Sequence, residues 1–165
     1  MPRSKRSGSA PLRSVRGADG RWRVASGTPW EPKVGYARAV RSGARVYVSG
    51  TTATGRGGTV VGRGDPYRQT VRALDNIERA LEAAGSSIAD VVRGRVYVTR
   101  IGDFAPIARA LGERFRPVRP ALTLVAVRAL VDPAMRVEIE VDAEDRPAVR
   151  APSTRRGDRR ARAYK

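Results

Sequence analysis

The sequence predicts an α+β domain in which one mixed β-sheet carries both of its helices on one face. Two observations lead to this expectation. Segments with the two-residue alternation typical of strands are interrupted by only two segments with helical spacing. The order of the expected elements is β-β-(β)-α-β-α-β-β, and strand runs separated by single helices favour one sheet with one layer of helices.

Two strands, at residues 35–40 and 44–52, are expected to open the domain and to be joined by a short turn. In the second strand, Val46 and Val48 point to one face and polar or aromatic residues to the other. A glycine-rich loop follows. Residues 60–61 are expected to add a short edge strand.

The first helix is predicted to begin after Asp65, because aspartate is a good N-cap and Pro66 falls in the first turn, where proline is tolerated. Its apolar residues recur at spacings of three and four. They form one stripe, which consists of Tyr67, Val71, Leu74, Ile77 and Leu81. Gly85 is expected to end the helix, since glycine adopts the left-handed conformation without strain.

The second half of the domain is predicted to contain a strand at 91–99, a helix at 103–115, and strands at 121–127 and 136–142. The apolar face of the second helix is expected to consist of Phe104, Ile107, Leu111 and Phe115. Valine, leucine and isoleucine stand on both sides of several strands. This pattern suggests that another subunit covers the open face of the sheet.

The composition excludes several kinds of site. The chain has no cysteine and no histidine, so it cannot form disulfides, Cys-His zinc sites or a Ser-His-Asp triad. No metal-ligand cluster and no phosphate-binding glycine motif is visible, so neither a metal nor a cofactor is expected. No apolar run is long enough to span a membrane, and nothing indicates export, so a cytoplasmic protein is expected.

The net charge of +17 is concentrated at the two ends. Residues 1–28 hold seven basic and one acidic residue, and residues 144–165 hold eight basic and three acidic residues. Both ends are predicted to be disordered tails around a domain at 29–143. They would attract nucleic acid, but 30 of the 33 basic residues are arginine, so a general arginine bias is the favoured explanation and a contact with nucleic acid the alternative.

A series of motifs resembles the Rid (RidA/YjgF-type) family. The motifs occur in the family's order and consist of VGYARAV at 34–40, VYVSGT at 46–51, QTVRALDNIERALEAAG at 69–85, ADVV at 89–92 with VYVT at 96–99, RPA at 119–121 and VEIE at 137–140. The resemblance implies the chorismate-mutase-like α+β fold and a homotrimer with small-molecule pockets at its subunit interfaces. It also implies hydrolysis of reactive imines and enamines to keto acids and ammonia.

The resemblance also implies roles for individual residues. Tyr36 matches a pocket tyrosine, Gly50 matches a glycine whose backbone faces the ligand, and Ser49 precedes it in the same motif. Glu138 matches the glutamate that positions the hydrolytic water, and a carboxylate can do this without histidine. From the pattern alone, Glu138 is equally well one of the outward residues of a half-solvated strand.

The chain departs from the family pattern at Leu122, where the imine deaminases have an arginine that binds the substrate carboxylate. Arginine would make two charge-assisted hydrogen bonds there, each worth roughly 1.5–3 kcal/mol. We therefore expect α-imino acids to bind poorly. Arg38 lies two residues after Tyr36, on the same face of a strand, and is a candidate for supplying the missing cation; it is equally a candidate surface arginine.

Three functions remain open on the sequence alone. The first is hydrolysis of a small imine or enamine less acidic than an α-imino acid, with Glu138 holding the water. The second is a non-catalytic trimer that binds a small apolar metabolite. The third is nucleic-acid binding through the basic tails.

Overall fold

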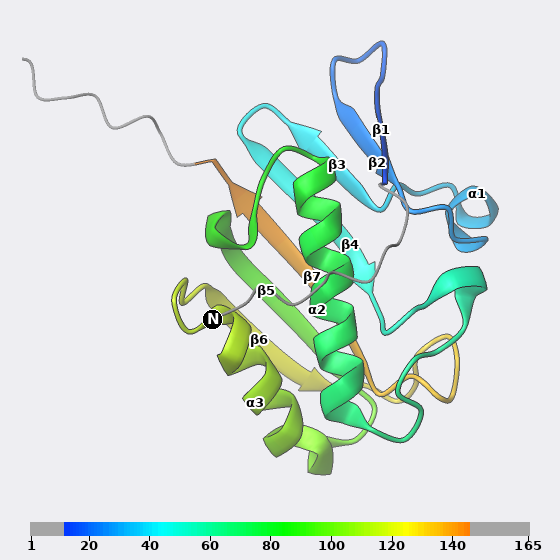
Figure 1. Cartoon of the computed structure of the whole chain (residues 1–165), viewed down its shortest axis with the longest axis vertical. Helices are drawn as coiled ribbons and strands as arrows, with labels where there is room; N and C mark the ends of the chain where they lie inside the picture. Colours follow the sequence, from blue (N-terminus) through cyan, green and yellow to red (C-terminus); the bar gives the residue numbers. More distant parts are fainter. Residues whose placement is uncertain (1–11, 146–165) are drawn as a thin grey trace, which may run out of the picture.

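One seven-stranded sheet forms the frame of the molecule, and two long helices cover one of its faces (Figure 1). The computed structural model describes residues 12–145. The strand order is β1-β2-β3-β4-β7-β5-β6, and only β5 and β6 run parallel to each other. The predicted α+β class, with its helices on one face of a mixed sheet, is therefore confirmed.

The bounds of the elements differ from the expected ones mainly at the N-terminus. The strands are β1 (Arg13–Arg16), β2 (Trp22–Ala25), β3 (Ala39–Ser42), β4 (Arg45–Thr51), β5 (Val91–Val98), β6 (Ala121–Ala126) and β7 (Val137–Glu144). The helices are α1 (Trp30–Val34), α2 (Pro66–Ala83) and α3 (Phe104–Phe115), with short 3-10 turns at Arg56–Gly58, Ile88–Asp90 and Ile101–Asp103. The expected edge strand at 60–61 is a single bridge between Thr54 and Val60.

The core lies between the sheet and the two long helices. The central strand β7 buries every second residue, and its buried side chains are Val137, Ile139, Val141 and Ala143. Helix α2 begins as predicted, because the Asp65 side chain accepts a hydrogen bond from the Arg68 amide at 2.9 Å. On α3 the apolar face begins only at Ile107, since Phe104 is 54% exposed.

The prediction that residues 1–28 form a disordered tail is wrong for the part that the structure describes. Strands β1 and β2 pair with each other, and β2 pairs with β3, so this hairpin extends the sheet. Val24 is 1% exposed and belongs to the core. The rest of the expected tails, residues 1–11 and 146–165, lies outside the described residues.

The hairpin was missed for a physical reason. Its two strands are only four residues long, RSVR and WRVA, and three of these eight residues are arginine. Such segments show little apolar alternation. The two strands are stabilised instead by the pairing of β2 with β3 and by burial of the single residue Val24, neither of which a local pattern reveals.

The face of the sheet that the helices leave open carries both charged and apolar side chains. Arg95 on this face pairs with Glu140 at 2.9 Å and with Asp142 at 3.6 Å. Exposed apolar side chains occur on it at Tyr47 and Val125. The outward positions of β7 are acidic, as the alternation in its sequence predicts.

No helix among residues 12–145 is both long enough and apolar enough to cross a bilayer.

Candidate functional site

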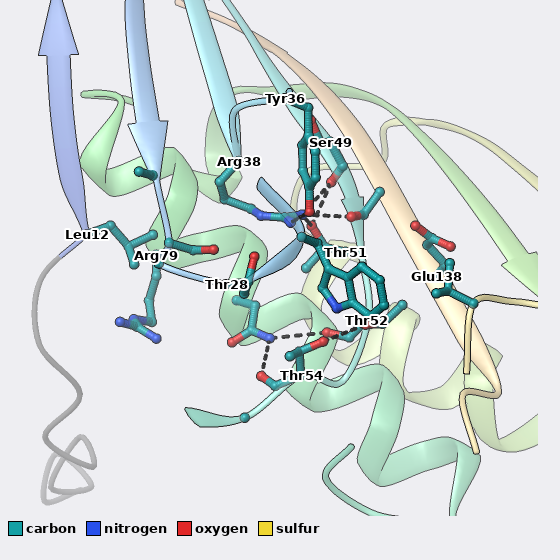
Figure 2. Close-up of a pocket in the computed structure, with 18 of the residues that line it drawn as sticks. Leu12, Thr28, Tyr36, Arg38, Ser49, Thr51, Thr52, Thr54, Arg79 and Glu138 are labelled. Atoms are coloured by element: carbon teal, nitrogen blue, oxygen red, sulfur yellow. Dashed lines mark hydrogen bonds between the residues drawn. The ribbon is translucent and has the colours of Figure 1, made fainter. Parts of the chain in front are cut away.

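A cavity of about 720 Å³ lies where the end of β4 meets the chain before β3 and the N-terminal hairpin. It brings together five of the six site residues expected from the sequence, which are Tyr36, Arg38, Ser49, Gly50 and Glu138. Figure 2 shows Tyr36 and Arg38 beside the end of β4, with Glu138 on the neighbouring strand. Residues from three motifs that are far apart in the sequence therefore line the same cavity.

An irregularity in β4 shapes this wall of the cavity. Val48 pairs with Val141 and Thr51 pairs with Ile139, so β4 carries one more residue than β7 over the same stretch. Such a bulge kinks a strand and redirects its side chains. It places Ser49 and Gly50 at the kink, next to the carboxylate of β7 that faces the cavity.

Arg38 is 8% exposed, so it is not a surface arginine. Its Nη1 donates to the Gly50 carbonyl at 2.7 Å and to Thr51 Oγ1 at 3.0 Å, and its Nη2 donates to the Tyr36 hydroxyl at 2.7 Å. Arg38 thus ties the bulge of β4 to Tyr36. Because the Tyr36 hydroxyl accepts from Arg38, its own proton remains available for donation to a ligand.

Glu31 compensates the charge of Arg38 and was not recognised from the sequence. Its Oε1 lies 3.6 Å from Arg38 Nε, and both side chains are buried. The same carboxylate accepts hydrogen bonds from the amides of Ser26, at 3.1 Å, and Gly27, at 3.2 Å. An acidic residue in a five-residue helix gives no pattern that predicts such a role.

Glu138 is the carboxylate that faces the cavity. Burial raises its pKa; Arg38 opposes this shift, and Glu140 adds to it. The side chain is half-buried and makes no hydrogen bond to another of the described residues. Its oxygens are therefore available to a water molecule or a ligand.

The other end of the cavity is formed by residues that sequence reasoning missed. Helix α2 contributes Arg72, Asn76 and Arg79, which the spacings of four and three residues place on one helix face. The Asn76 amide donates to the carbonyls of Thr52 at 3.1 Å and Thr54 at 2.9 Å. A stripe of polar residues on a helix looks like any solvated face until the tertiary structure places a cavity beside it.

Leu122 is the one expected site residue that does not line this cavity. It lies on β6, and the strand order separates β6 from β7 by β5. There it is 45% exposed and packs over Gly94, where an added Cβ would lie 2.8 Å from Leu122 Cδ1. Leu122 can therefore reach a cavity of this kind only on another copy of the chain.

Within residues 12–145, no three histidine, cysteine, aspartate or glutamate side chains are grouped so that they could hold a metal ion.

Comparison with known proteins places the chain in a family. The family model described as Endoribonuclease L-PSP matches residues 28–145. A protein of Streptomyces coelicolor, described as uncharacterized, is 43% identical over 121 residues, which are 73% of this chain and 90% of the relative.

Two solved structures extend the comparison. A Mycobacterium tuberculosis member of the YjgF/YER057c/UK114 family is 44% identical with a TM-score of 0.69, over 75% of this chain and 98% of that one. TdcF of E. coli, solved with bound serine, is 27% identical with a TM-score of 0.62, over 67% of this chain and 88% of that one. The chain therefore belongs to the YjgF/Rid family, the family of the Endoribonuclease L-PSP model.

Proposed function

We propose that the protein hydrolyses small imines or enamines in the cavity, with Glu138 holding the attacking water. One observation carries the proposal: Glu138 is a half-buried carboxylate whose pKa is raised by burial and which faces the cavity without a hydrogen bond to another described residue. A carboxylate with a raised pKa is a better general base than an exposed one, and it can return the proton later.

The reaction follows from the groups around Glu138. Water adds to the carbon of the protonated imine as one of its two protons passes to Glu138, which gives a neutral tetrahedral carbinolamine. Glu138 returns that proton to the nitrogen, the C–N bond breaks and ammonia leaves, and Glu138 takes the remaining hydroxyl proton as the carbonyl forms. The Tyr36 hydroxyl, oriented by Arg38 at 2.7 Å, can donate a hydrogen bond to the reacting nitrogen or to the developing oxyanion.

The preferred substrate lacks a carboxylate on the reacting carbon. Arg38 is occupied by Gly50, Thr51, Tyr36 and Glu31, so it orders the wall of the cavity rather than offering a two-pronged site for a carboxylate. Leu122 cannot bind a carboxylate at all. The serine bound in TdcF shows that a relative accepts a small amino acid, so α-imino acids are the comparison substrates.

A homotrimer with the ligand at its subunit interfaces is part of the proposal. The position of Leu122 on β6 supports it, because that residue can approach a Glu138 cavity only from a second chain. Native mass spectrometry tests the assembly. A monomer mass at micromolar concentration would contradict it.

The test of the reaction is the decay of 2-iminobutanoate generated in place, with the natural protein, Leu122→Arg and Glu138→Ala side by side. We expect little acceleration by the natural protein, acceleration by Leu122→Arg, and none by Leu122→Arg combined with Glu138→Ala. Inactivity of both the natural protein and Leu122→Arg, with imines lacking the α-carboxylate also unaffected, would contradict the proposal.

Two other functions keep specific support. A non-catalytic trimer that binds a small metabolite fits the same cavity; Glu138→Ala separates it from the hydrolase, since binding alone would survive that change. Nucleic-acid binding fits the net charge of +17 and the family model's description as an endoribonuclease. It predicts salt-dependent retention on heparin that falls when the chain is shortened to residues 12–145, the part that keeps the hairpin and Val24.

A further inference from the structure

We propose that the end of the cavity remote from Glu138 binds an anionic group of the ligand, a carboxylate or a phosphate, through Arg72 and Arg79 of α2 with Arg13 of β1. These arginines are not the residues to which hydrolysis is assigned. That the bound anion is part of a substrate rests on the proposed function, but binding of an anion can be measured without any turnover.

The geometry of α2 turns these cations into the cavity. Arg72, Asn76 and Arg79 share one helix face and all line the cavity. Two acidic residues of the same helix face α3 instead: Asp75 and Glu78 each lie 2.6 Å from Arg114. Helix α2 therefore presents two of its three arginines to the cavity and uses two of its carboxylates to bind α3.

The charges that line the cavity are unequal. The lining residues among those described include four arginines, Arg13, Arg38, Arg72 and Arg79, and one carboxylate, Glu138. Arg38 is compensated by Glu31, which does not line the cavity. The residues that line the cavity from α2 and β1 therefore carry more positive than negative charge, which attracts anions.

Two further polar residues, Asn76 and Thr28, line the same cavity. The Asn76 amide nitrogen is fixed by the carbonyls of Thr52 and Thr54, and Arg72 Nε donates to the same Thr54 carbonyl at 3.4 Å, so this wall is ordered before a ligand arrives. Thr28 Oγ1 lines the cavity, is buried and has no hydrogen-bond partner among the described residues. An anionic oxygen would satisfy that hydroxyl.

The two ends of the cavity are separate. In Figure 2, Arg79 and Leu12 lie on one side and Glu138 on the other, with Tyr36, Arg38 and Thr51 between them. A carboxylate attached directly to the reacting carbon stays beside Glu138. A group that reaches Arg79 must stand at the far end of a longer molecule, and the cavity offers that molecule the apolar side chains of Leu12, Trp30 and Val34.

This end of the cavity is partly built by the N-terminal hairpin. Leu12 and Arg13 come before residue 28, where the match to the family model begins. Arg13 therefore belongs to a segment outside the family match, whereas Arg72 and Arg79 lie inside it. The anion site also explains how the ligand can be acidic although Leu122 replaces the family's arginine.

The experiment is calorimetric binding of three probes to the full chain: hexanoate, hexyl phosphate and uncharged 1-hexanol. We expect one of the two anions to bind the natural protein more tightly than 1-hexanol. The comparison of hexanoate with hexyl phosphate shows whether the site prefers a carboxylate or a phosphate. Arg72→Gln with Arg79→Gln should weaken that anion about tenfold or more and leave 1-hexanol unchanged. Arg68→Gln, an exposed residue of α2 outside the cavity, is the matched control and should change neither.

Two further variants make the result decisive. Arg72→Lys with Arg79→Lys should restore part of the lost affinity, and unchanged thermal unfolding of each variant excludes loss of the fold. Equal anion affinity in the natural protein and the double Gln variant would overturn the site. If the natural protein and Glu138→Ala both bind the anion normally but the natural protein hydrolyses no imine, the proposed function is contradicted. The anion site would then still be supported.

Discussion

Gly50 and Glu138 lie so close together that a Cβ added at residue 50 would be 2.2 Å from Glu138 Oε1. Gly50 is not among the glycines with positive φ, so its role is to leave space rather than to permit an unusual backbone. The position of the carboxylate in the cavity thus depends on a missing methyl group one strand away. This relationship can be tested separately from stability.

Gly50→Ala should reduce hydrolysis strongly and stability little. The clashing atom is the end of a flexible side chain, so Glu138 can rotate away, and we expect a loss of unfolding free energy of about 1 kcal/mol or less. The carboxylate then leaves its place, and kcat/KM should fall about a hundredfold. Activity assays and urea unfolding measure the two effects. If the activity of Gly50→Ala equals that of the natural protein, the position of Glu138 is not what matters.

The double variant Gly50→Ala with Glu138→Ala is the control for this clash. Removal of the carboxylate abolishes the contact, so Gly50→Ala should then have no further effect on stability. A double-mutant cycle measures the coupling. Full additivity of the two changes would show that the contact is absent in solution.

Arg38 is predicted to be needed for the fold as well as for the site. Arg38→Leu leaves Glu31 buried without its cation and frees Tyr36 and Thr51, so unfolding free energy should fall by about 3 kcal/mol. Arg45→Leu, which removes an exposed pair to Glu144 at 3.8 Å, should change it by less than about 1 kcal/mol. Denaturant unfolding of both variants compares them, and a similar small loss for both would contradict the assignment.

The raised pKa of Glu138 predicts how stability depends on pH. Because the folded state holds this proton more tightly than the unfolded state, stability is lost as pH rises from the ordinary value of 4.5 through the raised pKa. Glu138→Gln removes that loss, so the variant should be the more stable protein at pH 7. The advantage should disappear below about pH 4.5. Unfolding of the two proteins at pH 4, 5.5 and 7 measures it, and a difference independent of pH would show that the pKa is ordinary.

The hairpin makes a prediction about stability. Val24→Ala removes most of a side chain that is 1% exposed, and it should cost about 2 kcal/mol. Val15→Ala on the neighbouring strand, where the side chain is 65% exposed, should cost less than about 0.5 kcal/mol. Thermal unfolding of the full chain compares the two. Equal small effects would mean that the hairpin does not pack on the core.

The parts of the fold that sequence analysis predicted are those with strong local patterns. Helix α2 combines an N-cap at Asp65 with a regular apolar stripe, and β7 alternates over its length, so both follow from neighbouring residues alone. The hairpin of β1 and β2 does not, because its order comes from pairing with β3. The same distinction holds for the site.

Tyr36, Gly50 and Glu138 were predicted through motifs, and the structure brings them together. The motif could not show that the Arg38 donors are taken up by Gly50 and Tyr36, since these contacts depend on the bulge in β4. Arg79 was not predicted as a site residue, because the cavity beside it is formed in part by the hairpin, which the sequence analysis did not predict.

The two outer strands of the sheet differ in what they allow other molecules to do. The exposed edge at β1 is short and carries Arg13 and Arg16, whose charges oppose pairing with another strand. The edge at β6, with the sequence ALTLVA, has no charge. Head-to-tail growth of a sheet from chain to chain needs two compatible edges, and here one of them is guarded. The arginines of the hairpin therefore oppose the addition of a further strand at the β1 edge, whereas the β6 edge has no such charge.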